Sequence, residues 1–578
     1  MGHGLARLTR LLGDLKRRRV YHVTAVYLAV GFVIIEAADL LLPALPLDDP
    51  SLVYRLVVAI TAAGLPVAIV LSWVYRIGPG GLERDRGEAA VDAPPAPPSL
   101  PAAGERRPSI LVLPFEDLSP DSDAAYLCAG LTDEIITDLA SVKAPVISRT
   151  SAMQLGRGGR DIETLRSELG VHYLLEGTVQ KLGSSVRINV KLVDVTTGGL
   201  LWARKFRGEL ERLFDIQETI SRNVADTLPL EIGRDEERLL SHQRIPDPKA
   251  HEYYLRARHE IFQFSEEAIR RGETYLERAL EIMEDNVTLL AAMGYIQWQY
   301  VNAGVDPDPA RLDRAEAYAR RILELHPASP HAHRLFGLAA VHRGQARTAI
   351  RELETVLGAD PNDSDALLWL SILYGLAGEC ERAAPLVDRI LWLDPLPPLH
   401  QGLRGFLAVM SGDLEEGADG YRRAYELEPD NPILGLGYGQ SLAMAGRHEE
   451  AVDALGRLVA GAPGSFLAAV AGFLIAGLEG DGDRVRALLS DELRGAGAAD
   501  PQIAWTLAQG LALVGEVEEA VWFLRAGSAH GLVNRALLAE HDPLLRALRG
   551  DGAFQALIAG LPAPRRPAWA GAESPASP

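Results

Sequence analysis

The chain has 578 residues but only two cysteines, Cys128 and Cys380, which lie far apart in the sequence. Two such thiols cannot form a disulfide framework or a four-ligand zinc site, so we expect both to be buried apolar side chains. Lysine is also scarce, and the formal net charge is −20. A chain this acidic lacks the clustered positive charge that binding to DNA or RNA requires, so no nucleic-acid partner is expected.

Catalytic and metal-binding motifs are missing as well. The sequence contains no HExxH or GxSxG motif, and the glycine-rich run Gly156–Arg160 lacks the order of a phosphate-binding loop. His331, His333 and His342 fall near one helix face, but no carboxylate or cysteine stands at metal-ligand spacing from them. We therefore predict that the chain is not an enzyme and that it has no catalytic residue, cofactor or metal site.

Two apolar stretches near the start have the length of membrane-spanning helices. Val20–Leu42 and Leu56–Tyr75 contain no Lys or Arg, and each is close to the roughly 20 residues that cross a bilayer core. Aromatic residues cluster near their ends, as membrane interfaces favour. The sequence therefore predicts a basic N-terminus over 1–19 and a two-helix transmembrane hairpin over 20–76, with the lipid bilayer as a partner.

The basic residues around this hairpin predict its orientation. Six Lys and Arg residues precede the first stretch and three Arg residues follow the second, whereas the loop between them contains only Arg55. Positive charge marks the cytoplasmic side, so we predict a protein of the bacterial inner membrane with both termini and the folded domains in the cytoplasm. Residues 77–108 are rich in Pro, Ala and Gly and are expected to form a semi-extended linker.

Residues 109–240 have the alternating pattern of a small α+β domain. Short apolar runs predict strands at 109–115, 145–148, 172–180, 186–195 and 200–206. Helical spacing predicts helices at 126–142, 161–169 and 213–240. Three carboxylates near the first strand could bind a cation, although a solvated acidic loop is more common, and these are Asp117, Asp121 and Asp123.

Four segments of this domain resemble, in order, the TolB-like amino-terminal domain. They are Ser109–Pro120 (SILVLPFEDLSP), Gly130–Ala140 (GLTDEIITDLA), Tyr173–Gln180 (YLLEGTVQ) and Val186–Phe206. In many bacterial chains that domain follows a membrane hairpin, which the apolar N-terminal region resembles, and precedes tetratricopeptide repeats (TPRs). The resemblance implies a sensing or interaction module and supplies no catalytic residues.

A period of 34 residues dominates the chain after residue 247. Five prolines keep this spacing, at Pro327, Pro361, Pro395, Pro429 and Pro463. Five glycines keep it too, at Gly344, Gly378, Gly412, Gly446 and Gly480. A 34-residue period is the TPR signature, in which the glycine turns the chain between paired helices and the proline ends the second helix. We predict an all-α TPR solenoid over 247–561, with about seven units, five of them clear, and a disordered tail at 562–578.

The first helix of each unit lines the concave groove of such an array. The positions expected to line a partner groove are Arg334, Leu338, Ile372, Leu376, Phe406, Val409, Met410, Leu436, Gln440 and Met444. This surface is more apolar than a groove that binds a peptide carboxylate through Lys and Asn. It could bind an apolar peptide or helix of another protein. It could also pack on another part of the chain or on a second copy, so a homo-oligomer stays open.

Three functional hypotheses follow from the sequence. The first is a membrane-anchored, non-enzymatic scaffold that binds partner proteins through the TPR groove, in signalling or in envelope-associated assembly. The second is a membrane-tethered sensor, in which the α+β domain binds a small ligand and the repeats relay the result. The third is the regulatory part of a nucleotide-signalling enzyme, which is disfavoured because the domain that would do the chemistry is missing.

Overall fold

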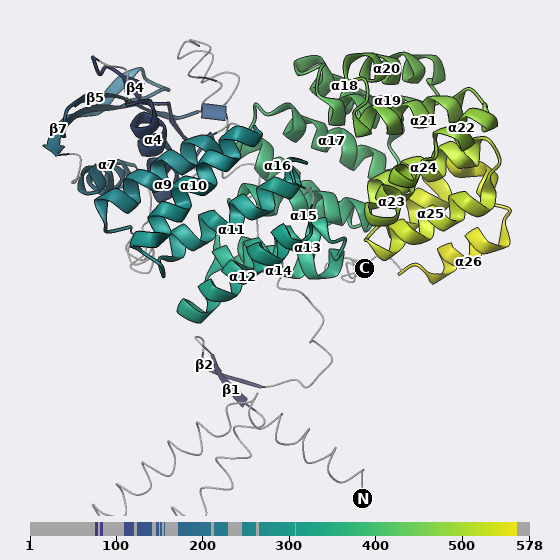
Figure 1. Cartoon of the computed structure of the whole chain (residues 1–578), viewed down its shortest axis with the longest axis horizontal. Helices are drawn as coiled ribbons and strands as arrows, with labels where there is room; N and C mark the ends of the chain where they lie inside the picture. The colour runs from purple at the N-terminus through teal and green to yellow at the C-terminus, as the bar shows by residue number, and fades with distance from the viewer. Residues whose placement is uncertain are drawn as a thin grey trace, which may run out of the picture. The chain divides into compact units, whose positions relative to one another are not determined.

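The computed structural model describes residues 75–78, 81–84, 109–120, 124–141, 146–149, 151–152, 155, 171–209, 213–228, 245–261, 265–306 and 308–562. The chain divides into two compact units, residues 1–96 and residues 97–578. In the first unit, strands β1 (Tyr75–Gly78) and β2 (Gly81–Arg84) pair as an antiparallel hairpin. All the other described elements belong to the second unit (Figure 1).

The predicted inner-membrane localisation, with two spans and cytoplasmic domains, is corrected by the structure. Among the described residues, no helix is long and apolar enough to cross a membrane. The longest described α-helices have 17 residues, short of the roughly 20 that a span needs. Tyr75, the last residue of the second predicted span, begins strand β1. The rest of both predicted spans, 20–42 and 56–74, lies outside the described residues, as does most of the predicted linker.

The second unit begins with a mixed sheet. Its described strands are β3 (Ile110–Val112), β4 (Glu116–Asp117), β5 (Tyr173–Leu182), β6 (Ser185–Asp194) and β7 (Gly199–Glu209). Strands β3 and β4 both run parallel to β5, whereas β5, β6 and β7 form an antiparallel meander. Gly183 and Gly198 have positive φ in the two tight turns of this meander, a conformation that costs glycine little.

The strands of the meander lie within a few residues of those expected from the sequence. The strand expected at 145–148 is reduced to a single parallel bridge between Val146 and Ile110. The helix expected at 161–169 lies outside the described residues. The long helix expected at 213–240 corresponds to α7 (Leu213–Thr227), and residues 229–240 are again outside the described part.

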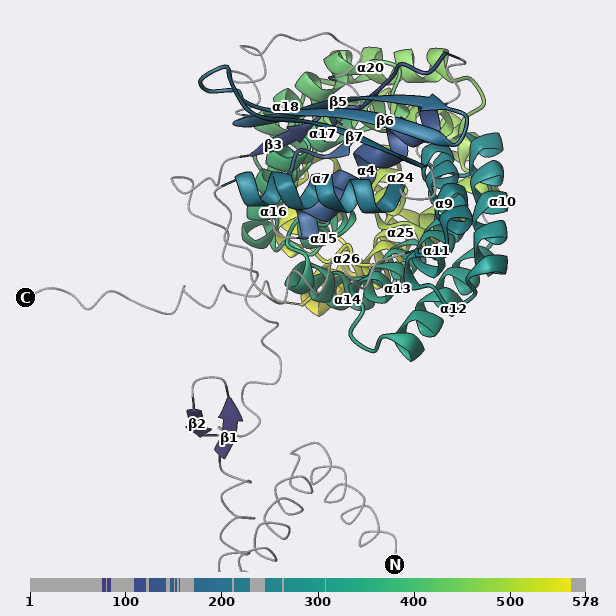
Figure 2. The same ribbon diagram turned by 90° about the vertical axis from the view of Figure 1, so that its left-hand side faces the viewer.

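Helices α4 (Ala125–Ser141) and α7 cover one face of the sheet (Figure 2). Strand β6 alternates strictly, because every second side chain points toward these helices and is buried. The buried side chains of β6 are Val186, Ile188, Val190 and Leu192. They pack with Leu131 and Ile135 of α4 and with Ile220 of α7 in one apolar core.

Paired helices make up the rest of the unit. The first are α9 (Pro248–Ile261), α10 (Glu266–Ile282), α11 (Val287–Asn302), α12 (Ala310–Leu325), α13 (Pro330–His342), α14 (Ala346–Ala359), α15 (Ser364–Leu376) and α16 (Cys380–Leu393). They continue with α17 (Pro398–Ser411), α18 (Leu414–Leu427), α19 (Pro432–Met444), α20 (His448–Gly461), α21 (Phe466–Leu478) and α22 (Gly482–Leu488). The last are α23 (Asp491–Ala499), α24 (Pro501–Leu513), α25 (Val517–Ala529), the short turns η3 (Leu537–His541) and η4 (Pro543–Leu548), and α26 (Gly552–Gly560).

The glycines that recur every 34 residues all stand directly after the first helix of a pair, or one residue further along. Their φ angles are positive in all five cases, from 64° at Gly344 to 90° at Gly412. This left-handed conformation reverses the chain between the two helices, and it is strained for residues that carry a Cβ.

The sheet and the first helices of the array share one core. Helix α4 lies against α9, and Tyr254 and Leu255 of α9 are buried together with Leu131 and Ile135 of α4. The approach is close, because a Cβ at Gly130 would come within 2.7 Å of the Leu255 side chain. The α+β region and the repeat array are therefore packed as one body.

Candidate functional site

An apolar pocket of about 480 Å³ lies between α15, α17, α19 and α24. Seven of the ten groove residues expected from the sequence line it, namely Ile372, Phe406, Val409, Met410, Leu436, Gln440 and Met444. The other three lie elsewhere. Leu338 and Leu376 are 0% and 2% exposed in the helix core, and Arg334 lines a second, polar cavity.

The chain's own C-terminal segment is hydrogen-bonded to the ends of two helices of this expected groove. The backbone N–H groups of Val533 and Asn534 both donate to the Leu376 carbonyl, each at 2.9 Å. The Asn534 side-chain amide donates to the carbonyl oxygens of Met410 (2.8 Å) and Gly375 (3.2 Å). These contacts hold the segment against the C-terminal ends of α15 and α17. Phe406 is only 7% exposed.

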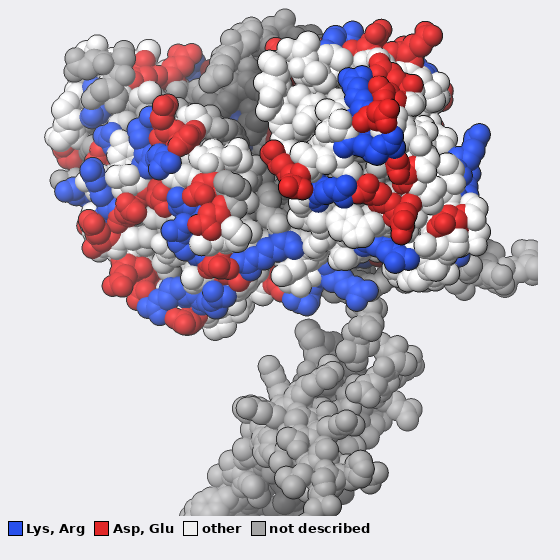
Figure 3. All heavy atoms as spheres, turned by 45° about the vertical axis from the view of Figure 1, so that its right-hand side comes forward, with Lys and Arg blue, Asp and Glu red and all other residues white. Residues whose placement is uncertain are grey.

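The rim of the apolar pocket, in contrast, is open. Ile433 and Leu399 stand at the starts of α19 and α17, they both line the pocket, and they are 56% and 40% exposed. Neither residue was among those expected to line the groove, although each directly follows a proline that begins a helix. Elsewhere on the array, acidic and basic side chains are interspersed, as the face in Figure 3 shows. Many of them form ion pairs, such as Arg447 with Glu450 at 2.7 Å.

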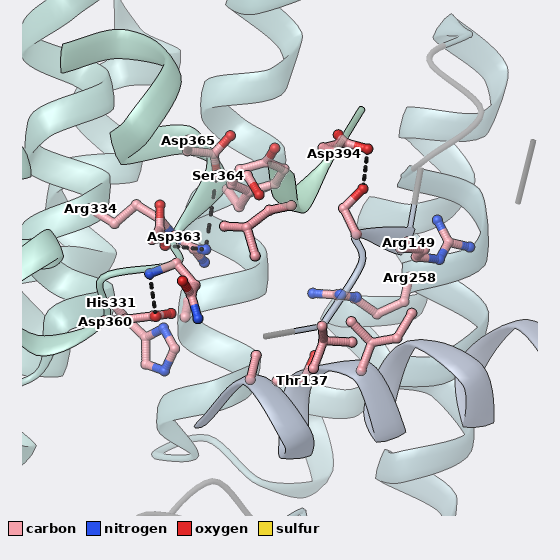
Figure 4. A pocket seen from close by; sticks show the side chains of 18 of the residues that line it. Thr137, Arg149, Arg258, His331, Arg334, Asp360, Asp363, Ser364, Asp365 and Asp394 are labelled. Atoms are coloured by element: carbon pink, nitrogen blue, oxygen red, sulfur yellow. Dashed lines mark hydrogen bonds and ion pairs between the residues drawn. The ribbon is translucent and has the colours of Figure 1, made fainter. Parts of the chain in front are cut away.

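A polar cavity of about 470 Å³ lies where the α+β region meets the inner side of the array (Figure 4). Its walls come from α4, from residues 146–149, and from helices α9, α11, α13, α15 and α17. Figure 4 shows Arg149 and Arg258 on one side of the cavity and three aspartates on the other. These are Asp360, Asp363 and Asp365.

The arginine side is built around one buried carboxylate. Asp133 on α4 is 5% exposed and accepts hydrogen bonds from Nε and Nη2 of Arg258, the first at 2.7 Å. Nε of Arg149 lies 3.6 Å from the same carboxylate. Burial lowers the pKa of Arg149, and the neighbouring Arg258 lowers it further, whereas Asp133 opposes the shift.

The aspartate side holds three carboxylates around one guanidinium. Nη1 of Arg334 lies 3.4 Å from Asp363 and 4.0 Å from Asp365. Its buried Nε has no hydrogen-bond partner among the described residues. Asp363 also caps α15, because its carboxylate accepts the Ala366 N–H at 2.8 Å. Burial, together with the charge of Asp363, raises the pKa values of Asp360 and Asp365 to about 6.

Hydrogen bonds also join the α+β region to the turn between α16 and α17. Ser148 N–H donates to the Leu393 carbonyl at 2.7 Å, and its hydroxyl donates to Asp394. The Ser151 hydroxyl donates to Asp394 at 2.5 Å and accepts the Leu396 N–H at 3.1 Å. These bonds join two parts of the cavity wall that are far apart in the sequence.

Of the three carboxylates considered as possible cation ligands, the structure describes only Asp117. Asp117 accepts backbone N–H groups of Ser119 and Ala124 at 2.8 and 2.9 Å and so closes its own loop, while Asp121 and Asp123 lie outside the described residues. Over the described ranges, no group of His, Cys, Asp or Glu could hold a metal ion.

The two cysteines and the three histidines noted in the sequence lie among other side chains of the protein. Burial raises the pKa of the Cys128 thiol to about 12, and Cys380 is half-buried. The His342 ring lies 5.7 Å from the rings of both Trp298 and Trp369. His331 lines the polar cavity, and His333 contacts a glutamate at 2.8 Å.

Matches to protein-family models support the TPR prediction. For the α+β region they give a family other than the TolB-like one. Residues 334–398 and 404–466 match the tetratricopeptide-repeat model, which confirms the TPR prediction. Residues 106–223 match the second domain of HilA/YgeH-like transcriptional regulators, rather than the TolB-like domain that the motifs resemble. The molecule is thus multidomain, with a large helical TPR solenoid and a small sheet region, and TPRs form protein-interaction scaffolds.

Two curated relatives match parts of the chain. One, named "Putative adenylate cyclase 3" from Rhizobium meliloti (strain 1021), is 33% identical over 259 residues, which are 44% of this chain and 43% of that protein. The other, "Cellulose synthase 2 operon protein C" from Komagataeibacter xylinus, is 28% identical over 186 residues, 31% of this chain and 13% of that protein. The chain spans less than half the length of either relative.

Two of the solved structures that resemble parts of the chain are TPR proteins. A tetratricopeptide repeat protein from Parabacteroides merdae is 16% identical, with a TM-score of 0.32, and the match covers 48% of this chain and 99% of that one. YrrB, described as a TPR protein with an unusual peptide-binding site, is 19% identical, with a TM-score of 0.26 and coverage of 33% and 95%.

Proposed function

We propose that the chain is a non-enzymatic scaffold that binds a partner protein through the apolar pocket between α15, α17, α19 and α24. The observation that carries this proposal is the open rim of the pocket. Ile433 and Leu399 expose large apolar side chains above a floor of buried ones, such as Phe406. Exposed apolar side chains gathered at a pocket are typical of protein-binding surfaces.

The chemistry of the pocket indicates the kind of segment that it takes. Its floor is apolar, and hydrogen-bonding side chains such as Gln440, Gln502 and Asp500 stand along its wall. The volume of about 480 Å³ accommodates a few large side chains of a partner. We therefore expect an amphipathic helix or extended segment that inserts apolar side chains beside Ile433.

Site-specific photocrosslinking in cells tests this proposal. A photoreactive residue at position 433 should capture a discrete partner protein. The matched control is position 427, because Leu427 is also an exposed apolar residue, 62% exposed, but does not line the pocket. The proposal fails if both positions give the same adducts, or if position 433 gives none.

We also propose that the chain acts in a signalling assembly. One relative is named a putative adenylate cyclase, and one matching domain model belongs to transcriptional regulators, which supports a role in a signalling assembly. Together with the motif resemblance to the TolB-like domain, they favour an interaction or sensing module in the α+β region. Formation of cyclic AMP by the purified chain from ATP and Mg²⁺ would contradict the non-enzymatic role.

A second candidate function is ligand sensing, which the polar cavity favours. The cavity is lined by both the α+β region and the array, so a molecule bound there would contact both. Ligand binding to the folded state raises its stability. A low-molecular-weight extract of bacterial cells should therefore raise the melting temperature of the full chain, and an unchanged melting temperature would contradict sensing.

A further inference from the structure

We infer that the edge of strand β7 binds an extended acidic segment of a partner protein, which adds to the sheet as a further strand. This surface belongs to the α+β region, so the inference is separate from the apolar pocket and from the polar cavity. Two features carry it. They are the unpaired backbone edge of β7 and the positive charge of the sheet face beside that edge.

Strand β7 stands at one end of the order of strands in the sheet. It pairs with β6, and no other strand pairs with it among the described residues. Its 11 residues make it the longest described strand, and Figure 1 shows it at the left-hand end of the second unit. An edge strand has unpaired N–H and C=O groups along one side, with which an extended peptide can pair.

The face of the sheet that points away from α4 and α7 is positively charged along β6 and β7. Every second residue of β6 points toward these helices, so Arg187 and Lys191, which alternate with those residues, lie on the outward face. Arg207 lies directly opposite Arg187, and Lys205 is two residues before Arg207 on the same face. All four side chains are exposed. Glu209, at the end of β7, is the one carboxylate on the outward side of these two strands.

The cations nearest the edge lack partners of opposite charge. Arg187 and Arg207 face each other across the pairing, and like charges in that position destabilise a sheet. Lys191 pairs with Glu176 of β5 at 3.2 Å. By contrast, no ion pair joins Arg187, Lys205 or Arg207 to a described carboxylate. A partner segment with carboxylates on this face would supply the missing negative charge.

The other side of the β7 edge is apolar. Trp202 and Phe206 are half-buried, pack against the core beneath the sheet and have ring centroids 6.5 Å apart. Leu200 and Leu201, at the start of β7, are 60% and 45% exposed. Since the side chains of a strand alternate between two faces, an added strand would place one set beside the cations and the other beside these rings. We therefore expect a segment in which acidic and apolar residues alternate.

Two other partners suit this edge less well. A second copy of the chain would bring its own Lys205 and Arg207 to the edge, and charges of one sign keep such edges apart. A nucleic acid has no peptide groups to pair with the edge. The net charge of −20 also repels a long polyanion.

The binding of short labelled peptides to the full chain, followed by fluorescence anisotropy, tests the inference. The probe is a peptide of alternating Glu and Val, about eight residues long, which is enough for one strand. It should bind, with an affinity that falls as the salt concentration rises. The control is the same peptide with Lys in place of Glu, which should not bind.

Two N-methylated forms of the probe test the backbone pairing. One carries a methyl group on every Val nitrogen, and the other carries one on every Glu nitrogen. In an extended strand the N–H groups of successive residues point to opposite edges, so each form is blocked along one edge only. One form should keep binding, and the other should bind at least about tenfold more weakly, because its blocked edge is the one that faces β7.

Variants of the chain locate the site. Lys205→Gln combined with Arg207→Gln should weaken binding of the Glu-Val peptide at least about fivefold, because two charge contacts are lost. The matched control is Lys249→Gln combined with Arg457→Gln, which removes two exposed cations from helices α9 and α20. The control should bind as the wild type does. All four side chains are exposed, so both double variants should keep the wild-type melting temperature.

Several results would overturn the inference. Equal affinity of the two N-methylated peptides would show that the backbone edge is not used. Unchanged binding by the Lys205 and Arg207 double variant would place the site elsewhere. The absence of binding up to about 1 mM would exclude the surface altogether. An oligothymidine of the same length that binds as tightly as the peptide would make this a nucleic-acid surface instead.

Discussion

At the scale of the residue, the turn glycines are under two different physical constraints. Gly412 and Gly446 both have positive φ, 90° and 79°. A Cβ at Gly446 would meet no atom within 4 Å, whereas a Cβ at Gly412 would collide with the His541 imidazole. The 34-residue period predicts the turn at both positions, because both lie between paired helices. It contains no information on the contact with His541, which belongs to a distant segment.

The two positions should therefore respond differently to alanine. We expect Gly446→Ala to lower the free energy of unfolding by about 1 kcal/mol, the cost of left-handed backbone strain. Gly412→Ala should cost about 1–3 kcal/mol more, because the new methyl group overlaps the imidazole. Adding His541→Ala to Gly412→Ala should recover part of that difference. Denaturant unfolding measures these values, and equal costs at both glycines would show that the His541 contact is absent.

Most of the charged residues that line the polar cavity were not predicted from the sequence. Of its charged lining, only Arg334 was among the expected groove residues, and it was selected for its position in a repeat. In the sequence, Asp133 is one of several acidic residues on a predicted helix. In the structure it is buried and pairs with two arginines. Such a pairing depends on how the α+β region packs on the array, and no spacing along the chain encodes that packing.

At the scale of the element, the repeat helices were predictable and the C-terminal segment was not. Helix pairs repeat their small residues and turns every 34 residues, so local sequence is sufficient to locate them. The segment after α25 was expected only to continue the all-α array to residue 561. Its defining hydrogen bonds run from Val533 and Asn534 to Leu376, a non-local partner that periodicity does not reveal.

The buried amide of Asn534 is expected to hold this segment in place. Asn534 is 2% exposed and donates to two buried carbonyls, so Asn534→Leu leaves both without that donor. We expect a loss of about 2–4 kcal/mol in the free energy of unfolding. Asn223→Leu, on an exposed face of α7, is the control and should change it by less than about 0.5 kcal/mol. Comparable stability of the two variants, measured by denaturant unfolding, would contradict the proposed role of Asn534.

At the scale of the whole second unit, the expected continuous groove is divided. The C-terminal segment is hydrogen-bonded to the ends of α15 and α17, and the α+β region is hydrogen-bonded to the turn between α16 and α17. The cavities along the described part of the array include one apolar and one polar cavity. The curl of a solenoid depends on small rotations between repeats. A sequence period specifies the repeats but not these rotations, so the closure of the array could not be predicted.

The central claim, that the array binds a partner protein through the apolar pocket, is tested most directly by the affinity of Ile433→Asp for the protein crosslinked at position 433. Ile433 is 56% exposed, so the change should leave the melting temperature near that of the wild type. We predict that Ile433→Asp weakens binding at least about tenfold, because a charge replaces an apolar side chain in the pocket. Leu427→Asp, outside the pocket, should bind as the wild type does. Equal affinity of Ile433→Asp and the wild-type chain would contradict the account.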